Sequence, residues 1–588
     1  MNDLTETAQN WGVGLHYYDV FGNRYEASRD VLARLIDAMS ASGVTPRPAD
    51  PIQDEPLRAY QGDGRRSWVL GVQLYAVRSR RNWGHGDFTD LARLVELAGA
   101  RGASGVGLNP LHALFPDRAD DASPYAPNSR IFLKLLYIDV EAIAEFPGLA
   151  ATGLGSEVET LRATDTIAYD RVAAVKMHAL HVTHACFREK ASAARREEFR
   201  AWQADQSETL LRFACFEVLR RQYAPRPWTE WPEPWRHPTR AQLDEFCRAN
   251  AVDCEFHEFV QWIADSQLGA CAAAARRLGM PIGLYTDLAV GIDRHGADAW
   301  SAQDAVLAGV SMGAPPDEFN PGGQDWGLAP FNPHAIPAGD FAVMRQLMSA
   351  AMRHAGAIRL DHVLGLKRVF MVPLGLPASE GAYVQFPFEP LLRVIAEESN
   401  RLRCIVIGED LGTVPENFRE TITRWGLLGY RVMLFEREGE GRFRPPEAYP
   451  AQALATFGTH DLPTFSGWLA AHDLMIKRGI GLDPGESDES RAWALTKLRE
   501  ILAERGAGYP ADDLAAVAAF LAATPSRLVV VALDDVLGVL DQVNIPGTVS
   551  QHPNWRRKLP VALEELETHE SLNRVAEVFA KAGRSFRA

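Results

Sequence analysis

The stretch CIVIGEDLG, residues 404–412, joins a short apolar run directly to a glycine and two acids. An apolar run of this length, rich in isoleucine and valine, is typical of a strand that is buried on both faces of a parallel sheet. The glycine and the acids that follow predict that this strand ends in a polar loop. The fold therefore depends on how many such runs the chain contains.

Seven further segments share this pattern, with helical segments between them. In chain order the eight runs are VLGVQLYAV (69–77), GVGLNPLHAL (105–114), PIGLYTDLAVG (281–291), AIRLDHVLG (357–365), CIVIGEDLG (404–412), YRVMLFE (430–436), ALATFGTHD (453–461) and RLVVVALDDVLG (527–538). Eight buried strands that alternate with helices predict an α/β protein with a (β/α)8 TIM barrel. A doubly wound open sheet is the structural alternative, because a strand count from one sequence can err.

The segments outside these runs predict two additions to the barrel. Residues 1–65 are expected to form a small helical N-terminal appendage, because SRDVLARLIDAMSASG (28–43) has a serine start, apolar residues at helical spacing and a glycine stop. The segment PRPADPIQDEP (46–56) reads as an extended linker. The catalytic barrel is expected over residues 66–588, with an inserted, mainly helical subdomain over about 115–280, between the second and third strands.

Composition excludes several kinds of partner. The 588-residue chain has a formal net charge of −15 and no basic face, which argues against a nucleic-acid partner. No apolar run approaches the ~20 residues of a membrane span, and the start MNDLTETAQNWG is unlike a signal peptide, so we expect a cytoplasmic protein with no membrane partner. The six cysteines are scattered and predict reduced thiols rather than a metal site. The oligomeric state stays open.

Four of the eight runs end in an acid, at the place where a barrel carries its chemistry. These acids are Asp287, Asp361, Glu409 and Asp461. A single acid at a strand end is usually a helix cap or a turn former, but four on one rim repel each other unless the site uses them. Clustered carboxylates without a metal-ligand pattern suit glycosyl chemistry, in which one acid attacks the anomeric carbon and another protonates the departing oxygen.

Three of these runs resemble the catalytic motifs of a known family. IRLDHVLG, VIGEDLGTVP and GTHDLPT are similar to the motifs of the 4-α-glucanotransferases of glycoside hydrolase family 77, also called amylomaltases or disproportionating enzymes. Three more segments match in the family's order: SPYAPNSRIFLKLLYIDVEAI (123–143), GAPPDEFNPGGQDWGLAPFNP (313–333) and VNIPGT…NWRRKL (543–559). The resemblance extends from about residue 67 to 560.

The resemblance implies the catalytic roles. Asp361 would be the nucleophile, and Glu409 would be the general acid/base. Asp461 would stabilise the transition state and bind the sugar. Arg359, two residues before Asp361 on the same strand face, would keep the nucleophile ionised and oriented through a charge-assisted hydrogen bond.

The resemblance also implies a set of substrate-binding residues. They are Tyr125, Asp287, Asp317, Gln324, Trp326, Arg359 and His460. Asp287 and His460 would hydrogen-bond the hydroxyls of the sugar in subsite −1, and Tyr125 would stack against that sugar. Gln324 and Trp326 would lie on a mobile loop, residues 313–333, that covers the acceptor side.

The implied function is that of a 4-α-glucanotransferase. It would transfer a segment of an α-1,4-glucan to the 4-hydroxyl of glucose or of another α-1,4-glucan, by a retaining double displacement through a covalent glucanyl-enzyme. The expected partners are maltooligosaccharides, glycogen or starch-type glucans, and glucose as acceptor, with no cofactor or metal. An amylase-like α-1,4-glucan hydrolase is the nearest alternative, because it uses the same acids. A non-catalytic glycan-binding barrel and a metal-dependent hydrolase also stay open.

Overall fold

The computed structural model describes residues 2–18, 23–46, 56–118, 121–316 and 322–587. Its centre is a sheet of eight parallel strands. They are β3 (Ser67–Val72), β4 (Gly105–Leu108), β7 (Gly283–Leu288), β12 (Ala357–Leu360), β15 (Ile405–Gly408), β16 (Gly429–Val432), β19 (Ala453–Thr456) and β20 (Leu528–Ala532). Each of the eight apolar runs therefore supplies one strand of this sheet, as predicted.

The order of the strands is β15–β12–β7–β4–β3–β20–β19–β16. The two outermost strands meet at a narrow seam, where Gly408 N donates to Leu428 O at 2.8 Å and Leu428 N donates to Val406 O at 2.9 Å. The sheet is thus a nearly closed barrel and not a doubly wound open sheet. Closure brings the carboxyl ends of all eight strands to one rim.

Helices surround the barrel in the order expected for alternating strands and helices. They are α3 (Phe88–Ala100), α12 (Ala342–Met352), α13 (Phe388–Leu402), α14 (Phe418–Arg424), α15 (Phe465–Leu469), α16 (His472–Gly479), α17 (Asp488–Arg505), α18 (Leu514–Ala523), α19 (Leu533–Val536) and α20 (Glu570–Lys581). Helix α18, with the sequence LAAVAAFLAA, is apolar on every side and is accordingly buried.

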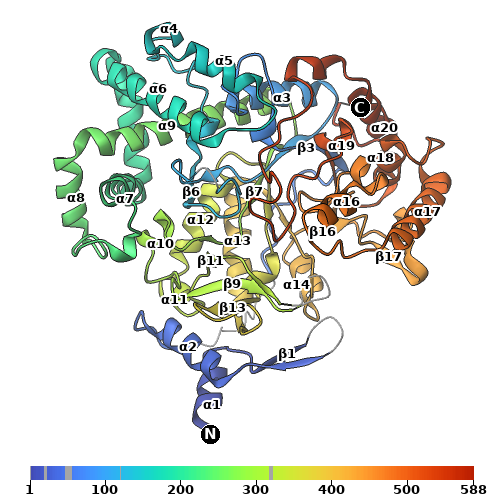
Figure 1. The fold of residues 1–588 in the computed structure, drawn as a ribbon, viewed down its shortest axis with the longest axis horizontal. Helices are drawn as coiled ribbons and strands as arrows, with labels where there is room; N and C mark the ends of the chain where they lie inside the picture. The colour runs from blue at the N-terminus through green and yellow to red at the C-terminus, as the bar shows by residue number, and fades with distance from the viewer. Residues whose placement is uncertain (1, 19–22, 47–55, 119–120, 317–321, 588) are drawn as a thin grey trace.

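A mainly helical insertion follows β4 and precedes β7, and it occupies the left side of the molecule in Figure 1. Its elements are β5 (His112–Ala113), β6 (Ser129–Leu133), α4 (Leu149–Thr152), α5 (Gly155–Ala163), α6 (Tyr169–Lys190), α7 (Ala193–Tyr223), α8 (Arg240–Ala249) and α9 (Ala251–Arg277). Trp228, Trp231 and Trp262 are all buried here, and Trp231 packs against Phe216. These tryptophans stabilise the core of the insertion.

The N-terminal appendage contains two helices and a hairpin. They are α1 (Asn2–Asn10), β1 (His16–Tyr18), β2 (Arg24–Glu26) and α2 (Arg29–Ser40). The Ser28 side chain accepts a hydrogen bond from Val31 N and caps α2, as its position in the sequence predicted. Most of the predicted linker, residues 47–55, lies outside the described residues, and the exact domain boundaries stay predictions.

A second, antiparallel sheet stands beside the barrel. Its strands, in the order β10–β9–β13–β14, are β10 (Gln324–Asp325), β9 (Val310–Ala314), β13 (Arg368–Pro373) and β14 (Ala382–Gln385). Smaller elements nearby are β8 (Ile292–Asp293), α10 (Ala297–Ser301), β11 (Leu328–Ala329) and α11 (Ala335–Ala338). The short hairpin of β17 (Arg437–Glu438) and β18 (Arg442–Phe443) lies beside α17. Among the residues that the structure describes, no helix has both the length and the apolar character needed to cross a membrane.

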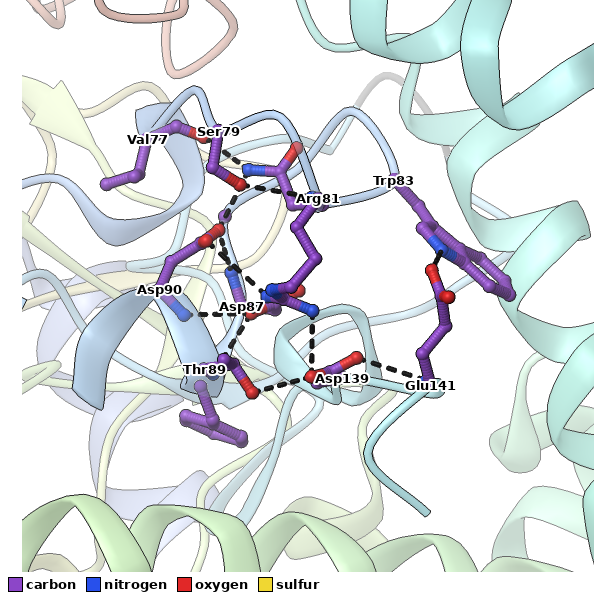
Figure 2. Close-up of polar contacts among 12 residues, drawn as sticks. Val77, Ser79, Arg81, Trp83, Asp87, Thr89, Asp90, Asp139 and Glu141 are labelled. Carbon is purple, nitrogen blue, oxygen red and sulfur yellow. Dashed lines mark hydrogen bonds and ion pairs between the residues drawn. The ribbon is translucent and has the colours of Figure 1, made fainter. Parts of the chain in front are cut away.

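A buried polar network joins the loop after β3 to the insertion (Figure 2). Arg81 forms ion pairs with Asp87, Asp90 and Asp139, and its Nη1 lies 2.7 Å from Asp139 Oδ2. The Asp87 side chain also accepts hydrogen bonds from the first turn of α3, which makes it the cap of that helix. One arginine therefore ties the start of α3 to the chain that follows β6.

Candidate active site

The structure brings the four predicted acids together at the barrel rim, around the guanidinium of Arg359. Nη1 of Arg359 donates to both carboxylate oxygens of Asp287, at 2.9 and 3.0 Å. Nη2 lies 2.9 Å from Asp361 Oδ1 and 3.8 Å from Glu409 Oε2. Asp461 completes the rim from the loop after β19.

Strand register explains why these groups meet. Arg359 of β12 pairs with Asp287 of β7, so the two side chains are neighbours across parallel strands. Asp361 is two residues beyond Arg359 and therefore projects to the same side of the chain. Burial alone would lower the pKa of Arg359, but the charges of Asp287 and Asp361 outweigh it and raise this pKa. Arg359 is thus a permanent cation within the cluster.

Glu409 directly follows β15 and is held by two backbone amides. His362 N donates to its Oε2 at 2.9 Å, and Leu411 N donates to its Oε1 at 2.8 Å. Burial raises the pKa of Glu409 to about 7, against the opposing effect of Arg359 and with a further contribution from the charge of Asp361. A carboxyl group that exchanges a proton near neutral pH can serve as a general acid and then as a general base.

Asp461 differs from Glu409 in its surroundings, since 46% of its side chain is exposed. Its Oδ1 accepts a hydrogen bond from Asn544 Nδ2 at 2.7 Å, and its Oδ2 lies 3.4 Å from His460 Nε2. Desolvation would raise the pKa of Asp461, but the charge and hydrogen bond of His460 and the bond from Asn544 lower it. Asp461 therefore presents a charged carboxylate to the cleft.

Tyr125 connects the two sides of the cleft. Its hydroxyl donates to Asp287 Oδ2 at 2.6 Å and lies 3.2 Å from His460 Nδ1. Its ring stacks on the His460 ring at 4.7 Å and 27°. One face of the Tyr125 ring is therefore already covered, and the prediction that this ring stacks on a sugar applies to its other face.

The predicted acceptor-side residues lie next to the loop that holds Asp361. Gln324 is in β10, and its Oε1 accepts a hydrogen bond from Trp326 Nε1 at 3.2 Å. The Trp326 ring meets the ring of His362 edge-on, at 5.2 Å and 81°, and His362 directly follows Asp361. Asp317 lies outside the described residues.

Sequence reasoning did not assign Asn544, Trp555 or His362 to the site. Asn544 and Trp555 belong to the motif VNIPGT…NWRRKL, but Asn544 is 83 residues from Asp461, and no local pattern indicates that contact. The Trp555 ring lies 5.2 Å from His460 and 5.6 Å from Tyr125. The position of His362 beside Asp361 was the one signal available for that residue.

A (β/α)8 barrel whose mouth holds a buried carboxyl group with a raised pKa beside further carboxylates suits chemistry on glycosidic bonds. The family model described as 4-alpha-glucanotransferase matches residues 72–564 of this chain. A 4-alpha-glucanotransferase of Mycobacterium tuberculosis is 38% identical over 554 residues, which cover 88% of this chain and 75% of the relative. That of Haemophilus influenzae is 34% identical, with 88% and 79% covered.

Solved structures show the same architecture. An amylomaltase from Corynebacterium glutamicum superposes with a TM-score of 0.84 at 27% identity, covering 98% of this chain and 99% of that one. An amylomaltase from Streptococcus agalactiae, in complex with acarbose, gives a TM-score of 0.73 at 18% identity and covers 89% and 100%, which supports the fold. This chain belongs to the 4-α-glucanotransferase family, glycoside hydrolase family 77.

Proposed function

We propose that this 4-α-glucanotransferase family member works by a retaining double displacement in which Asp361 is the nucleophile, Glu409 the acid/base and Asp461 the transition-state stabiliser. The observation that carries the proposal is the arrangement around Arg359. It pairs with Asp361 at 2.9 Å, while buried Glu409, with a pKa of about 7, retains a proton near neutrality. A nucleophilic carboxylate beside a second carboxyl group that can donate a proton is what the first step needs.

In the first half-reaction Asp361 attacks C1 of the donor glucan. Its Oδ1 is engaged by Arg359, which leaves Oδ2 to form the new bond to carbon. The bond between C1 and the leaving oxygen breaks as Glu409 transfers its proton to that oxygen. Asp461, charged and partly exposed, faces the positive charge that develops on the sugar.

In the second half-reaction Glu409, now a carboxylate, removes the proton from the 4-hydroxyl of an acceptor glucan. The acceptor oxygen attacks C1 and displaces Asp361, so two inversions give net retention. Water in place of the acceptor would give hydrolysis. The proposed donors are maltooligosaccharides and glycogen or starch-type glucans, with glucose as an acceptor.

Because its six cysteines are unpaired, we place the enzyme in the reducing cytoplasm.

The test is to incubate the purified protein with maltotriose and follow product lengths and total reducing ends. Transfer produces glucose and longer maltodextrins at a constant number of reducing ends, because each transfer breaks one linkage and makes one. Asp361→Asn should abolish the reaction, whereas Asp165→Asn, at a side chain that is 96% exposed, should not. A rising number of reducing ends with only shorter products would identify a hydrolase, and binding without turnover would identify a glycan-binding barrel.

A further inference from the structure

The N-terminal appendage lies against the antiparallel sheet β10–β9–β13–β14, which we call the acceptor-side sheet. In Figure 1 the blue elements α1, α2 and β1 lie directly below β9 and β13. This sheet contains Gln324 in β10, and its strand β13 begins just after the loop that holds Asp361. The appendage, although remote in sequence, is thus built onto the part of the structure that borders the proposed acceptor side.

The contact begins with backbone pairing. Val13 forms an antiparallel bridge with Val384 of β14. Gly14 N donates to Tyr383 O at 2.7 Å, and Gln385 N donates to Gly12 O at 2.9 Å. These bonds continue the acceptor-side sheet beyond β14, which would otherwise leave an unpaired edge.

Side chains of the appendage also pack on the sheet. Trp11 and Leu35 are buried in one apolar cluster with Met312 of β9 and Met371 of β13, and Trp326 packs against this cluster. A separate cluster holds Tyr17, whose ring meets those of Phe370 and Tyr383 at 5.4 and 6.2 Å. The position of Trp326 therefore depends on a core that the appendage helps to build.

The chain that follows Trp326 is tied to the appendage as well. Asn332 Nδ2 donates to Met39 O at 2.9 Å, and Asn332 is completely buried. His334 Nε2 lies 3.1 Å from Trp11 O, and the His334 and Trp11 rings meet edge-on at 5.0 Å. Packing at Met312 and hydrogen bonds at Asn332 and His334 thus fix the chain on both sides of Trp326.

Trp326 in turn connects to the catalytic groups. Its ring meets His362 at 5.2 Å, and His362 N donates to Glu409 Oε2 at 2.9 Å. The ion pairs of Arg359 with Asp287 and Asp361 involve no residue of the appendage. Movement of the appendage would therefore disturb the acceptor side of the cleft before it disturbs the groups that attack the donor.

We propose that the N-terminal appendage is a positioning element for the acceptor side. It holds Trp326 and Gln324 so that a glucan hydroxyl, rather than water, reaches the glucanyl-enzyme. This inference rests on the proposed function and adds a specific role to a segment that lies outside the barrel. His334 is the positioning residue through which it is tested.

Three single variants of the full-length chain test the proposal. His334→Phe keeps a ring against Trp11 but removes the hydrogen bond to its carbonyl, and His334→Gln restores a donor at a similar reach. His16→Phe is the matched control, since His16 is exposed in the same appendage and its ring meets Tyr18. For each variant we would measure transfer and hydrolysis from maltotriose, the KM for glucose as acceptor, and fluoride release from α-maltosyl fluoride, which reports the first half-reaction.

We expect His334→Phe to lower the ratio of transfer to hydrolysis by about threefold to tenfold, the range that one lost hydrogen bond supports. The acceptor KM should rise while fluoride release stays within about twofold, and His334→Gln should recover the ratio. An unchanged ratio in His334→Phe would overturn the proposal, and so would an equal loss of fluoride release and transfer. A wild-type protein that transfers nothing would instead refute the proposed function.

Discussion

Arg359 is the residue on which the charge balance of the site depends. It is the cation that contacts Asp287, Asp361 and Glu409, and it is almost completely buried. Its planar fork aims two nitrogens at two carboxylates in one fixed geometry, which the compact ammonium group of lysine does not reproduce. The arrangement of the carboxylates in the cleft therefore depends on the shape of the Arg359 side chain as well as on its charge.

Arg359→Lys should accordingly lower kcat for maltotriose disproportionation by about a hundredfold, as the loss of one preorganised donor does elsewhere. The charge is kept, but Asp287 and Asp361 can no longer be bridged in the same geometry. Steady-state kinetics of purified variants would measure this, with Arg65→Lys as an exposed control. A kcat within about threefold of wild type would show that charge alone suffices.

Glu409 gives the enzyme a predictable pH dependence. Its pKa is raised to about 7, and the proposed first step needs the protonated form, so kcat/KM for maltotriose should fall as the pH rises through about 7. The fall should be much weaker with α-maltosyl fluoride, because fluoride departs with little help from an acid. Two pH profiles of kcat/KM measure the difference. The same alkaline limb with both donors would contradict the role of Glu409 as acid.

Asn544, in the chain that follows α19, holds Asp461 through a hydrogen bond. Asn544→Ala removes the 2.7 Å hydrogen bond to Asp461 Oδ1 and should lower kcat by about tenfold, the cost of one bond to a charged group. Asn544→Asp should be worse, because two carboxylates would then face each other. The exposed Gln551→Ala, in the same loop, is the control. Equal activity of the Ala and Asp variants would show that Asn544 does not act through Asp461.

At the scale of elements, the network around Arg81 joins the start of α3 to the insertion (Figure 2). Burial raises the pKa of Asp87 to about 7, the charge of Asp90 raises it further, and Lys176 and Arg81 oppose this shift. A raised pKa means that the folded protein binds this proton more tightly than the unfolded chain. The stability that results is present below the unfolded pKa of about 4 and is lost as the pH rises through about 7.

Asp87→Asn should remove this dependence while it keeps the cap of α3, since Asn is as good an N-cap as Asp. The Tm of the variant minus the Tm of wild type should therefore become more positive between pH 5 and pH 8. Thermal unfolding at several pH values would measure it, and the exposed Asp165→Asn should show no such trend. A difference that becomes more negative with pH would mean that Asp87 is charged and stabilising in the folded state.

In the molecule as a whole, the eight barrel strands could be predicted from the sequence. The second sheet and the hairpin of the N-terminal appendage could not. The eight barrel strands are continuous apolar runs, and burial on both faces imposes that pattern whatever the strand contacts. Strand β9 pairs with β13 across a long stretch of chain, and this pairing leaves no local signal. Strands β1 and β2 are only three residues long, which is too short for a recognisable alternation of apolar and polar residues. Such pairing depends on the tertiary structure around the barrel, so no short stretch of sequence predicts it.

The residues of the site also fall into those that the sequence could place and those that it could not. Asp287, Asp361 and Glu409 could be placed at one rim because each ends, or directly follows, a predicted strand. The contact of Asn544 with Asp461 and the anchoring of His334 to Trp11 join segments that are far apart in the chain. Such contacts depend on how loops cross the barrel mouth, which apolar periodicity does not describe.

The whole molecule carries a net charge of −15, yet the acids of its cleft are already engaged by its own donors. Asp287 and Asp361 are paired with Arg359, and Glu409 accepts two backbone hydrogen bonds. Among the described residues, no group of three or more His, Cys, Asp or Glu is arranged to hold a metal ion. A divalent cation in this cleft would meet the positive charge of Arg359 at close range.

We therefore expect maltotriose disproportionation to proceed at an unchanged rate after dialysis against excess EDTA. The reason is that Arg359 supplies the positive charge that a metal would supply in a metal-dependent hydrolase. The measurement is the initial rate before and after dialysis, with calcium and magnesium added back separately. A loss of activity that either ion restores would contradict the proposed mechanism, because charge in the cleft would then come from a cation that the four acids bind directly.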